Sequence, residues 1–352
     1  MSSQPSFEKT QIAVIGGAGF VGSNLVKRLL ADTEKVQILV IDNLLSAERE
    51  NLPIDSRVEF IKDSITSEKA LNAIDDSFDY IFHLATYHGN QSSIHDPIKD
   101  HDNNLITTLQ LMNRVKDYKK IKKLVYSSAG CSAAKKTYGE AEETTEEAPI
   151  SLVQDSPYSI SKVIGEFYAV YFNKQHGLPT VRARFQNVYG PGEVLGAGEW
   201  RGTPATVWRN VTPTFVYKAL NNMHLQLHNG GDASRDFIFV DDICRGLMAC
   251  ALKGKAGDVY NLASGRETTI KEWAELIVKK TGSKSGIELL PKRDWDTSGK
   301  RFGSASKAKT ELGFSAQTDL EEGIEKTVNW TKQNWDFINA CISKHSDNMA
   351  RV

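Results

Sequence analysis

The sequence has few cysteines, no long apolar run and no excess of either charge. Its 352 residues include four cysteines, at positions 131, 244, 250 and 341, and their spacing fits neither a metal site nor a disulfide framework. We therefore expect reduced thiols and no bound metal. No stretch approaches the roughly 20 apolar residues that span a membrane. The formal net charge of -1 leaves no basic excess for neutralising nucleic acid, so neither membrane nor nucleic acid is expected as a partner.

Residues 1–9 also lack the basic and then apolar pattern of a signal peptide, so the chain is expected to be cytoplasmic. Neither an internal repeat nor a low-complexity linker is present. A composition of 40% hydrophobic and 25% charged residues allows a substantial core. The length suggests about two domains.

A glycine-rich turn near the N-terminus predicts a dinucleotide site. Residues 11–15 have the pattern of a buried strand, glycines follow at positions 16, 19 and 22, and a helical pattern continues to residue 30. These glycines allow a tight turn, a close approach of the backbone to a pyrophosphate and packing of the helix on the sheet. The helix N-terminus attracts the anion. The spacing is G-x-x-G-x-x-G, which differs from the G-x-G-x-x-G pattern of dehydrogenases.

The next predicted strand, residues 36–41, ends in Asp42, about 20 residues past the last glycine. An acid at that place can hydrogen-bond the adenosine ribose and repel a 2′-phosphate. The sequence therefore favours NAD over NADP as the cofactor.

Strand and helix signals alternate through the first half of the chain. The predicted strands are 11–15, 36–41, 58–61, 80–84, 123–127 and 180–185. The predicted helices include 103–118, 158–176, 211–221, 241–252, 270–281 and 320–334. This alternation predicts an α/β fold with a Rossmann-type, doubly wound parallel sheet. The acidic run 140–147 is expected to form a solvated loop.

Tyr158 and Lys162 stand four residues apart, so a helix would place both on one face. Free phenol has a pKa of roughly 10, too high for a base at neutral pH, but a neighbouring cation lowers it. Lys162 would supply that cation, and Tyr158 would then act as a general base. The spacing alone is weak, because many helices carry it by chance, and the glycine turn before it gives it weight.

Together with these motifs, further landmarks resemble the NAD-dependent epimerase/dehydratase family of extended short-chain dehydrogenases/reductases, which modify nucleotide sugars. The landmarks cover nearly the whole chain in order, at 42–44, 63–64, 83–86, 103–104, 127–128, 184–191, 235–242 and 260–265. Within that family, the chain resembles UDP-sugar 4-epimerases and, particularly through residues 85–90, 129–131 and 196–210, epimerases of bacterial O-antigen and other surface-polysaccharide pathways. Residues 196–210 depart from the short loop common among epimerases.

The resemblance implies a domain organisation. Residues 1–185 would form the NAD-binding Rossmann domain, with a strand and a helix contributed from 235–265. Residues 186–340 would form a smaller C-terminal α/β substrate-binding lobe, and residues 341–352 a C-terminal tail. The resemblance also implies a homodimer, in which helices 103–118 and 158–176 pack as an intersubunit four-helix bundle.

In doubly wound sheets the loops at the carboxyl ends of the strands hold the ligand, so the landmark residues should converge on one crevice. The expected cofactor contacts are Gly16, Gly19, Phe20, Val21, Gly22, Asp42, Asn43, Leu44, Ser46, Asp63, Ser64, Leu84, Ala85, Thr86, Asn104, Tyr158, Lys162 and Phe185. The expected contacts of a UDP-sugar are His88, Ser128, Asn187, Arg235, Arg293 and Arg301. By resemblance, Asn187, Arg235 and Arg293 would bind the diphosphate, which suits the fork of a guanidinium group.

The catalytic residues implied by the resemblance are Ser128, Tyr158 and Lys162. Ser128 and Tyr158 would share the proton of the sugar hydroxyl, while Lys162 would hold the nicotinamide ribose. Ser127 is the alternative for the role of Ser128. Cys131 is interpreted as a small buried side chain, not as a nucleophile.

Ser128 is followed by Ala129 and Gly130, where dehydratases of this family carry Asp and Glu, and decarboxylases also carry a Glu. Without an acid to protonate a leaving hydroxyl, dehydration is disfavoured. A 4-epimerisation needs only a reversible hydride step and room for the keto sugar to turn. The expected function is therefore NAD-mediated 4-epimerisation of a UDP-hexose, or of a UDP-hexosamine or uronate derivative, in surface-polysaccharide or O-antigen sugar biosynthesis.

Several alternatives remain open at this stage. A 4-keto reductase, a decarboxylase or a dehydratase of similar sugars shares the landmarks, and a non-catalytic dinucleotide sensor could share the glycine turn and Asp42. Residues 196–210 hold two tryptophans and two arginines, and could cover an acidic or N-acetylated sugar or form a dimer contact. The identity of the sugar is not encoded in any of these motifs.

Overall fold

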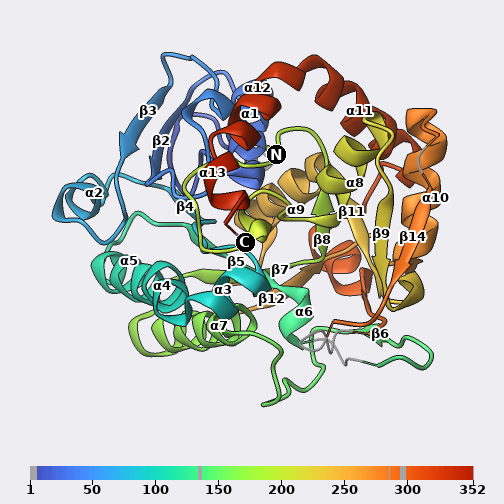
Figure 1. Cartoon of the computed structure of the whole chain (residues 1–352). Coiled ribbons are helices and arrows are strands. Elements are labelled where there is room, and N and C mark those ends of the chain that lie inside the picture. The colour runs from blue at the N-terminus through green and yellow to red at the C-terminus, as the bar shows by residue number, and fades with distance from the viewer. Residues whose placement is uncertain (1–5, 134–136, 285, 294–298, 352) are drawn as a thin grey trace.

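The computed structural model describes residues 6–133, 137–284, 286–293 and 299–351. Within these ranges, seven parallel strands form a central sheet in the order β12-β7-β5-β4-β1-β2-β3 (Figure 1). The strands are β1 (Thr10–Ile15), β2 (Val36–Asp42), β3 (Val58–Lys62), β4 (Tyr80–His83), β5 (Lys123–Ala129), β7 (Thr180–Phe185) and β12 (Val259–Leu262). Each predicted strand matches an observed one, and the order is that of a doubly wound sheet. The predicted fold class is confirmed.

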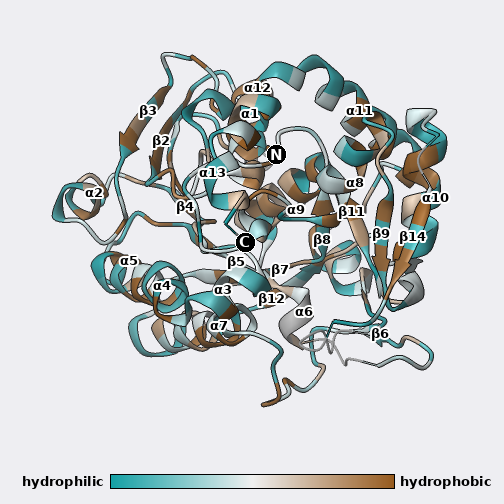
Figure 2. Cartoon of the chain, viewed as in Figure 1, coloured by the Kyte–Doolittle hydropathy of each residue, from teal (hydrophilic) through white to brown (hydrophobic). Residues whose placement is uncertain are grey.

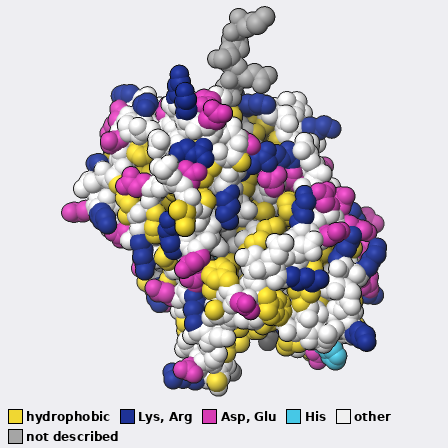
Figure 3. Space-filling model, turned by 90° about the horizontal axis from the view of Figure 1, so that it is seen from above, with side chains coloured by type: hydrophobic (Ala, Val, Ile, Leu, Met, Phe, Trp, Pro, Cys, Tyr) yellow, Lys and Arg dark blue, Asp and Glu magenta, His cyan; other side chains and the backbone are white. Residues whose placement is uncertain are grey.

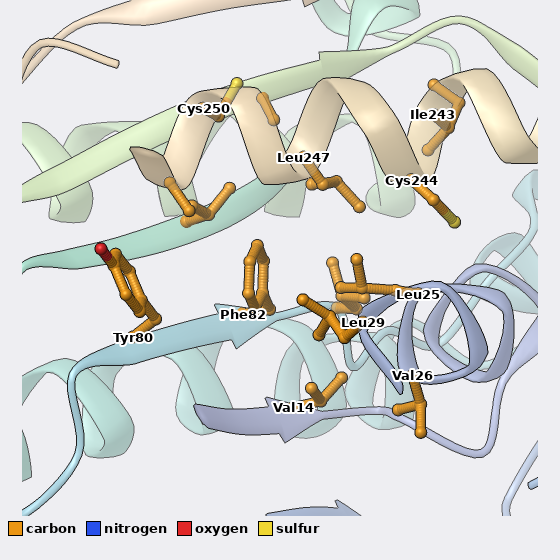
Figure 4. Packing of buried hydrophobic residues seen from close by; sticks show 14 of the residues in the cluster. Val14, Leu25, Val26, Leu29, Tyr80, Phe82, Ile243, Cys244, Leu247 and Cys250 are labelled. Atoms are coloured by element: carbon orange, nitrogen blue, oxygen red, sulfur yellow. The ribbon is translucent and has the colours of Figure 1, made fainter. Parts of the chain in front are cut away.

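Helices cover both faces of the sheet. On one face lie α1 (Phe20–Asp32) and α9 (Val240–Lys253), and on the other α5 (Thr107–Val115) and α7 (Pro157–His176). Figure 4 shows Leu25 and Leu29 of α1 gathered with Phe82 of β4 and Leu247 of α9. All four side chains have 0% exposure, and burying one such side chain contributes roughly 1.5–3 kcal/mol. This packing fixes α1, and with it the glycine turn, against the sheet.

The sheet strands are hydrophobic almost throughout, as parallel strands covered on both faces must be. All four residues of β4 are buried, and in β1 only Gln11 is partly exposed. Figure 2 shows the hydrophobic residues concentrated on strands such as β2 and on the helix sides that face them. Polar groups are therefore left to the strand ends, where the connecting loops lie.

The last strand of the sheet comes from the second half of the chain. Strand β12 pairs in parallel with β7, and α9, which precedes it, packs against α1. Both elements lie within the segment 235–265 that was expected to join the N-terminal sheet. The domain boundaries at residues 185 and 340 stay predictions.

A smaller lobe follows the sheet and contains three helices and several short strand pairs in the described residues. Its helices are α8 (Val211–Leu220), α10 (Ile270–Thr281) and α11 (Leu320–Gln333). Its strands pair as β8 (Asn187–Tyr189) with β11 (Phe237–Phe239), β9 (Leu225–His228) with β14 (Ile287–Leu290), and β10 (Ser234–Arg235) with β13 (Thr268–Thr269). The core centres on Trp273, which is fully buried and stacks on Phe237 with ring centroids 3.9 Å apart. A capping box of Thr269 and Glu272 starts α10.

Two predicted segments differ from the observed ones. The predicted helix 103–118 begins as the π-helix η2 (Asp102–Ile106) and continues as α5, which ends at Val115. The acidic run 140–147 is only partly solvated, because β6 (Glu143–Thr144) pairs with β15 (Phe302–Gly303). The Glu146 carboxylate is buried and accepts a hydrogen bond of 2.7 Å from the backbone N–H of Asn261. The remaining short elements are η1 (Arg49–Asn51), α2 (Glu68–Asn72), α3 (Asn90–His95), α4 (Pro97–His101), α6 (Gly130–Ala133), η3 (Pro204–Thr206), η4 (Asn229–Gly231) and η5 (Ala308–Leu312).

The end of the chain is helical where a tail was expected. Helix α12 (Trp335–Ser343) continues into residues 341–343, and α13 (Ser346–Met349) follows. Cys341 is buried in a cluster with Val194 and Leu195, and a ring nitrogen of His345 lies 2.9 Å from the carbonyl oxygen of Gly196. The C-terminal helices are thus packed on the segment that follows β8.

Across the described ranges, no helix combines the length and the hydrophobicity needed to cross a membrane. On the face seen in Figure 3, acidic and basic side chains are intermixed, with hydrophobic side chains between them.

Candidate active site

A cavity of about 680 Å³ lies at the carboxyl ends of the sheet strands and extends into the smaller lobe. The sheet side of its wall is formed by the loops that follow β1, β2, β4 and β7 and by the end of β5. The opposite side is formed by residues of α8 and β9 and by the segment around Arg235. Ligands of doubly wound folds bind in this crevice, at the point where the strand order reverses. Here that point lies between β1 and β4.

The turn after β1 has no room for a side chain at Gly16 or at Gly22. Gly16 has a φ of +83°, and a Cβ atom there would lie 2.5 Å from the backbone nitrogen of Ala85. A Cβ atom on Gly22 would lie 2.2 Å from the carbonyl oxygen of Gly16. The N-terminal residues of α1 line the cavity, and its first turn holds no acid. A close backbone turn ahead of an uncompensated helix N-terminus fits a pyrophosphate, so the residues present fit a dinucleotide.

Asp42 holds this turn in place from the end of β2. Its two carboxylate oxygens accept hydrogen bonds of 2.9 Å from the backbone N–H groups of Ala18 and Leu44. Burial raises the pKa of Asp42, and these N–H groups oppose that effect. The carboxylate also lines the cavity, and each oxygen keeps a lone pair. It can therefore fix the turn and still accept a hydrogen bond from a ribose hydroxyl. The contact with the ribose stays a prediction.

All the predicted cofactor contacts except Leu44 and Asn104 line this cavity. Asn104 lies behind the wall, is buried, and uses its whole amide within the protein. Its oxygen accepts from Thr86 Oγ1 at 2.9 Å and from the backbone N–H of Tyr87 at 2.7 Å. Its nitrogen donates to Asp100 and Ser161. Asn104 therefore positions the 84–87 loop, and no part of its amide remains for direct contact with a cofactor.

Tyr158 and Lys162 lie on α7 where it meets the cavity. Ser156 caps the helix by accepting a hydrogen bond from the backbone N–H of Ser159, and Pro157 occupies its first position. The Lys162 ammonium is buried, donates to the Ser127 carbonyl at 3.0 Å and lies 5.8 Å from the Tyr158 ring centroid. The predicted pair is thus together in the cavity wall.

His88 packs edge-on against the Tyr158 ring, with centroids 5.7 Å apart, and lines the cavity as predicted for a substrate contact. Burial lowers the pKa of His88 to about 3, and the positive charges of Arg201, Arg209 and Lys162 act in the same direction. The imidazole is therefore neutral at physiological pH.

Ser127 and Ser128 both line the cavity at the end of β5, and both are buried. The Ser127 hydroxyl donates to the His83 carbonyl oxygen at 3.0 Å. The Ser128 hydroxyl donates to Glu166 Oε1 at 2.5 Å. Because its proton is given to a carboxylate, Ser128 presents only lone pairs to a ligand. Its oxygen can accept and orient a sugar O–H, which suits the role expected of it.

Glu166 is a residue of this site that the sequence analysis missed. It is 2% exposed on α7 and forms two hydrogen bonds with the buried Arg184, of 2.8 and 2.9 Å. Burial alone would raise the pKa of Glu166, but the hydrogen bonds and charge of Arg184 lower it below its usual value. Glu166 follows Lys162 by four residues, as Lys162 follows Tyr158. Extending that spacing by one turn was the signal that could have found it.

The other predicted substrate contacts line the cavity on the side of the smaller lobe. They are Asn187, Arg235, Arg293 and Arg301. Arg235 donates to the carbonyl oxygens of Ser234 and Gly299 at 2.6 and 2.7 Å. In the part of the chain that the structure covers, Arg301 Nη1 is buried without a hydrogen-bond partner. The rest of the motif that follows Arg293, residues 294–296, lies outside the described residues.

The segment 196–210 closes one side of the cavity. Arg209 lines the cavity and donates to the carbonyl oxygens of Ser46 and Ala197, at 2.9 and 2.5 Å. Ser46 belongs to the loop after β2, so Arg209 joins this segment to the cofactor half of the site. Glu193 nearby accepts a hydrogen bond from Asn210, and burial raises the pKa of Glu193 to about 7.

The described cysteines contribute no reactive group to this wall. Cys244, Cys250 and Cys341 are buried free thiols, and burial raises the pKa of each. The side chain of Cys131 lies outside the described part of the structure.

Comparisons with known proteins agree with this geometry. The sequence model of the NAD dependent epimerase/dehydratase family matches residues 12–263. UDP-glucose 4-epimerase of Mycolicibacterium smegmatis is 30% identical over 321 residues, 90% of this chain and 96% of that protein. UDP-glucuronate 4-epimerase of Thermodesulfobacterium geofontis is 28% identical over 339 residues, 93% and 98% of the two chains. The crystal structure of the Bordetella bronchiseptica enzyme WbmF with NAD+ superposes with a TM-score of 0.88 and 55% identity, covering 98% of this chain and 99% of that one. WbmF has also been crystallised with NAD+ and UDP.

Proposed function

Because this chain belongs to the NAD dependent epimerase/dehydratase family, we propose that it is a UDP-sugar 4-epimerase that works through a 4-keto intermediate in surface-polysaccharide or O-antigen sugar biosynthesis. The choice of reaction rests on the residues that follow Ser128 in the cavity wall. Ala129 and Gly130 follow it there, and a Cβ atom on Gly130 would lie 2.2 Å from the Gln186 amide. The side-chain amide of Gln186 is therefore packed against Gly130, where a dehydratase needs an acid that donates a proton.

The cofactor is NAD, and it supplies a reversible hydride acceptor when bound. The residues that hold it are the glycine turn, the N-terminus of α1, Asp42 and the loop Leu84–Thr86. Asp42 favours NAD over NADP, because a 2′-phosphate would meet a carboxylate. The contact of Arg209 with Ser46 covers the same half of the cavity. Such a cover suits a cofactor that stays bound through the reaction cycle.

The proton of the sugar hydroxyl is moved by the pair on α7. Tyr158 accepts the proton from the C4 hydroxyl and returns it after the keto sugar has rotated in the site. Lys162 stabilises the negative charge on the phenol oxygen and holds the nicotinamide ribose. Before the transfer, the Ser128 oxygen can accept a hydrogen bond from the C4 hydroxyl and orient it, because its own proton is held by Glu166; the single hydrogen of that hydroxyl then passes to Tyr158. Apart from the hydride acceptor that NAD supplies, epimerisation thus requires no group beyond those already in the wall.

The nucleotide end of the substrate is bound by the smaller lobe. Asn187, Arg235, Arg293 and Arg301 are placed to meet the diphosphate of UDP. Guanidinium groups bind phosphate oxygens with two parallel hydrogen bonds. The complex of WbmF with UDP supports this choice of nucleotide.

We infer that the enzyme is a cytoplasmic homodimer in which α5 and α7 form a four-helix bundle with their counterparts. Large hydrophobic side chains are exposed on α7, namely Ile160 (46%), Phe167 (58%) and Tyr171 (51%). Ile94 on α3 and Ile98 on α4, which pack against α7, are exposed as well. An apolar surface of this kind marks an interface. The buried free thiols suit a reducing compartment.

The test is to incubate the purified protein with UDP-hexoses, UDP-N-acetylhexosamines and UDP-uronates and to follow the anomeric protons by NMR. We expect one pair of 4-epimers to interconvert without net formation or consumption of NADH. Tyr158→Phe should lower kcat by about 100-fold or more while the unfolding temperature is kept. A 4-keto-6-deoxy product, release of carbon dioxide or stoichiometric use of NADH would overturn the assignment in favour of a dehydratase, a decarboxylase or a reductase.

A further inference from the structure

Arg201 is a buried cation that has no counter-ion among the residues that the structure describes. Its side chain is 3% exposed, and none of its three guanidinium nitrogens has a hydrogen-bond partner among the described residues. Burying a charge is costly unless the group is paired and hydrogen-bonded. Burial lowers the pKa of Arg201 to about 9, and the charge of Arg209 adds to the effect. A buried guanidinium without hydrogen bonds is explained best by a ligand group that binds it and supplies the missing acceptors.

Other buried polar groups of this region also lack a hydrogen-bond partner among the described residues. The Arg201 guanidinium lies over the ring of Tyr87, 5.8 Å from its centroid. Tyr87 is 1% exposed, and its hydroxyl is also without a partner within the described ranges. The same holds for the hydroxyl of Ser92, on α3, and for that of Thr203, next to η3, and these two elements pack on each other. Each of these three hydroxyls can donate a hydrogen bond, and the Arg201 guanidinium adds donors and a positive charge.

This group of donors lies beside the reacting centre. Tyr87 precedes His88, whose ring contacts Tyr158 at 5.7 Å. Arg201 and Tyr87 are not among the residues that line the cavity, but residues close to them in the chain, His88 and Pro204, do line it. The positive charge of Arg201 also acts on His88. The missing partner is therefore expected on the part of the substrate that lies next to Tyr158.

We propose that Arg201 and Tyr87 bind a carboxylate on the sugar, so that the natural substrates are UDP-hexuronates. The proposal rests on the proposed epimerase function. A carboxylate matches the guanidinium fork and neutralises its charge, whereas an N-acetyl group would leave the charge uncompensated. In a hexuronate the C6 carboxylate is two bonds from C4, the carbon that Tyr158 serves. The diphosphates of UDP and NAD have their own sites, at the arginines of the smaller lobe and at the N-terminus of α1.

The experiment compares sugars that differ only at C6, namely UDP-glucose with UDP-glucuronate, and UDP-N-acetylglucosamine with its uronate. We expect a higher kcat/KM for the uronate of at least one pair. In Arg201→Gln the kcat/KM for that uronate should fall by about 10- to 100-fold, and by far less for the neutral sugar. Arg266→Gln, which removes an exposed arginine outside the cavity, should leave both values as in the wild type. Equal losses for the two sugars in Arg201→Gln would refute the proposal.

A binding measurement separates this proposal from the proposed reaction. With NAD present, UDP-glucuronate should raise the unfolding temperature of the wild type more than UDP-glucose does, and Arg201→Gln should abolish the difference. If no sugar nucleotide is epimerised but this difference is found, the carboxylate site stands and the reaction is wrong. If neutral sugars are epimerised and the difference is absent, the reaction stands and the carboxylate site is wrong. Tyr87→Phe, which removes one hydroxyl, replaces Arg201→Gln if that variant does not fold, and should lower the uronate preference about 3- to 10-fold.

Discussion

At the scale of single residues, the site depends on charged groups that are buried and paired. Glu166 is the clearest example, because its carboxylate holds Ser128 on one side and Arg184 on the other. Removing one partner of such a pair leaves the other charge buried and unpaired. The stability of the sheet and the orientation of the Ser128 hydroxyl therefore depend on the same carboxylate.

We predict that Glu166→Gln lowers the free energy of unfolding by about 3–5 kcal/mol, because Arg184 loses its counter-charge. Urea unfolding followed by tryptophan fluorescence measures the change. The matched control is Glu321→Gln, which removes an acid from the exposed ion pair with Lys279 and Lys280 and should leave the urea midpoint unchanged. A midpoint for Glu166→Gln that equals the control value would contradict the pairing described here.

The pH dependence of stability should reflect His83. This histidine is 1% exposed, and burial lowers its pKa to about 3, with the charge of Lys162 acting in the same direction. The unfolded chain therefore binds a proton near pH 6.5 that the folded chain refuses, so stability is lost as the pH falls from about 6.5 toward 3. Between pH 7.5 and pH 5 this single group should remove about 2 kcal/mol. His83→Asn should reduce the difference between the urea midpoints at these two pH values; an unchanged difference would exclude His83 as its cause.

Sequence reasoning at this scale could identify residues whose role depends on spacing. Tyr158 and Lys162 are separated by one helical turn, and Gly16 and Gly22 begin and end a turn that allows no side chain at either position. The contact of Arg201 with the Tyr87 ring could not be predicted, because the two residues are far apart in the chain. Their distinguishing property is that, among the described residues, their side-chain polar atoms have no hydrogen-bond partner. Asn104 was expected to contact the cofactor directly, because the sequence does not reveal its internal hydrogen bonds, which depend on residues from three other segments.

At the scale of secondary-structure elements, α7 has two functional faces. One carries Tyr158, Lys162 and Glu166 toward the sheet, and the other exposes Phe167 and Tyr171. We predict that Phe167→Glu converts the inferred dimer to a monomer, because a buried charge without a partner opposes association. Light scattering coupled to gel filtration measures the mass. Leu289→Glu, a change at an exposed leucine of β14, should leave the mass of the wild type, and a dimeric Phe167→Glu would argue against the bundle.

Helix α1 packs against the turn after β1 so closely that no side chain fits at Gly22. In Gly22→Ala the new methyl group would lie 2.2 Å from the Gly16 carbonyl oxygen, so the turn and the helix must separate. We predict at least a tenfold loss of NAD affinity by calorimetry, since the backbone no longer closes on the pyrophosphate. Gly286→Ala serves as the control, because its nearest neighbour would be 3.5 Å away, and should keep the affinity. Equal affinities for the two variants would exclude the steric argument.

The elements themselves were largely predictable, because hydrophobic periodicity reports burial within a strand or helix. The exceptions are segments whose structure depends on distant partners. Thr144 and Glu146 lie in an acidic run, yet they are buried because strand β15 and Asn261 come from the other end of the chain. Helices α12 and α13 occupy an expected tail because Cys341 and His345 pack on residues after β8.

At the scale of the whole molecule, Glu48 joins three regions that are far apart in sequence. It follows the cofactor loop of β2, accepts a hydrogen bond of 2.9 Å from the backbone N–H of Gly198, and pairs with Lys344 near the C-terminus. We predict that Glu48→Ala lowers the affinity for NAD by about 3- to 10-fold, because the loop loses its support. Calorimetry checks the value. Glu50→Ala, a neighbouring acid that is exposed, should bind NAD as the wild type does, and an equal loss there would assign the effect to net charge.

The contact of Arg209 with Ser46 and Ala197 has a thermodynamic consequence. It joins the segment 196–210 and the loop after β2 in one connected unit, so ordering one side orders the other. Coupling between two binding equilibria is reciprocal. The factor by which a bound sugar nucleotide raises the affinity for NAD must therefore equal the factor by which NAD raises the affinity for the sugar nucleotide. A sugar nucleotide whose binding NAD strengthens only slightly would strengthen the binding of NAD only slightly.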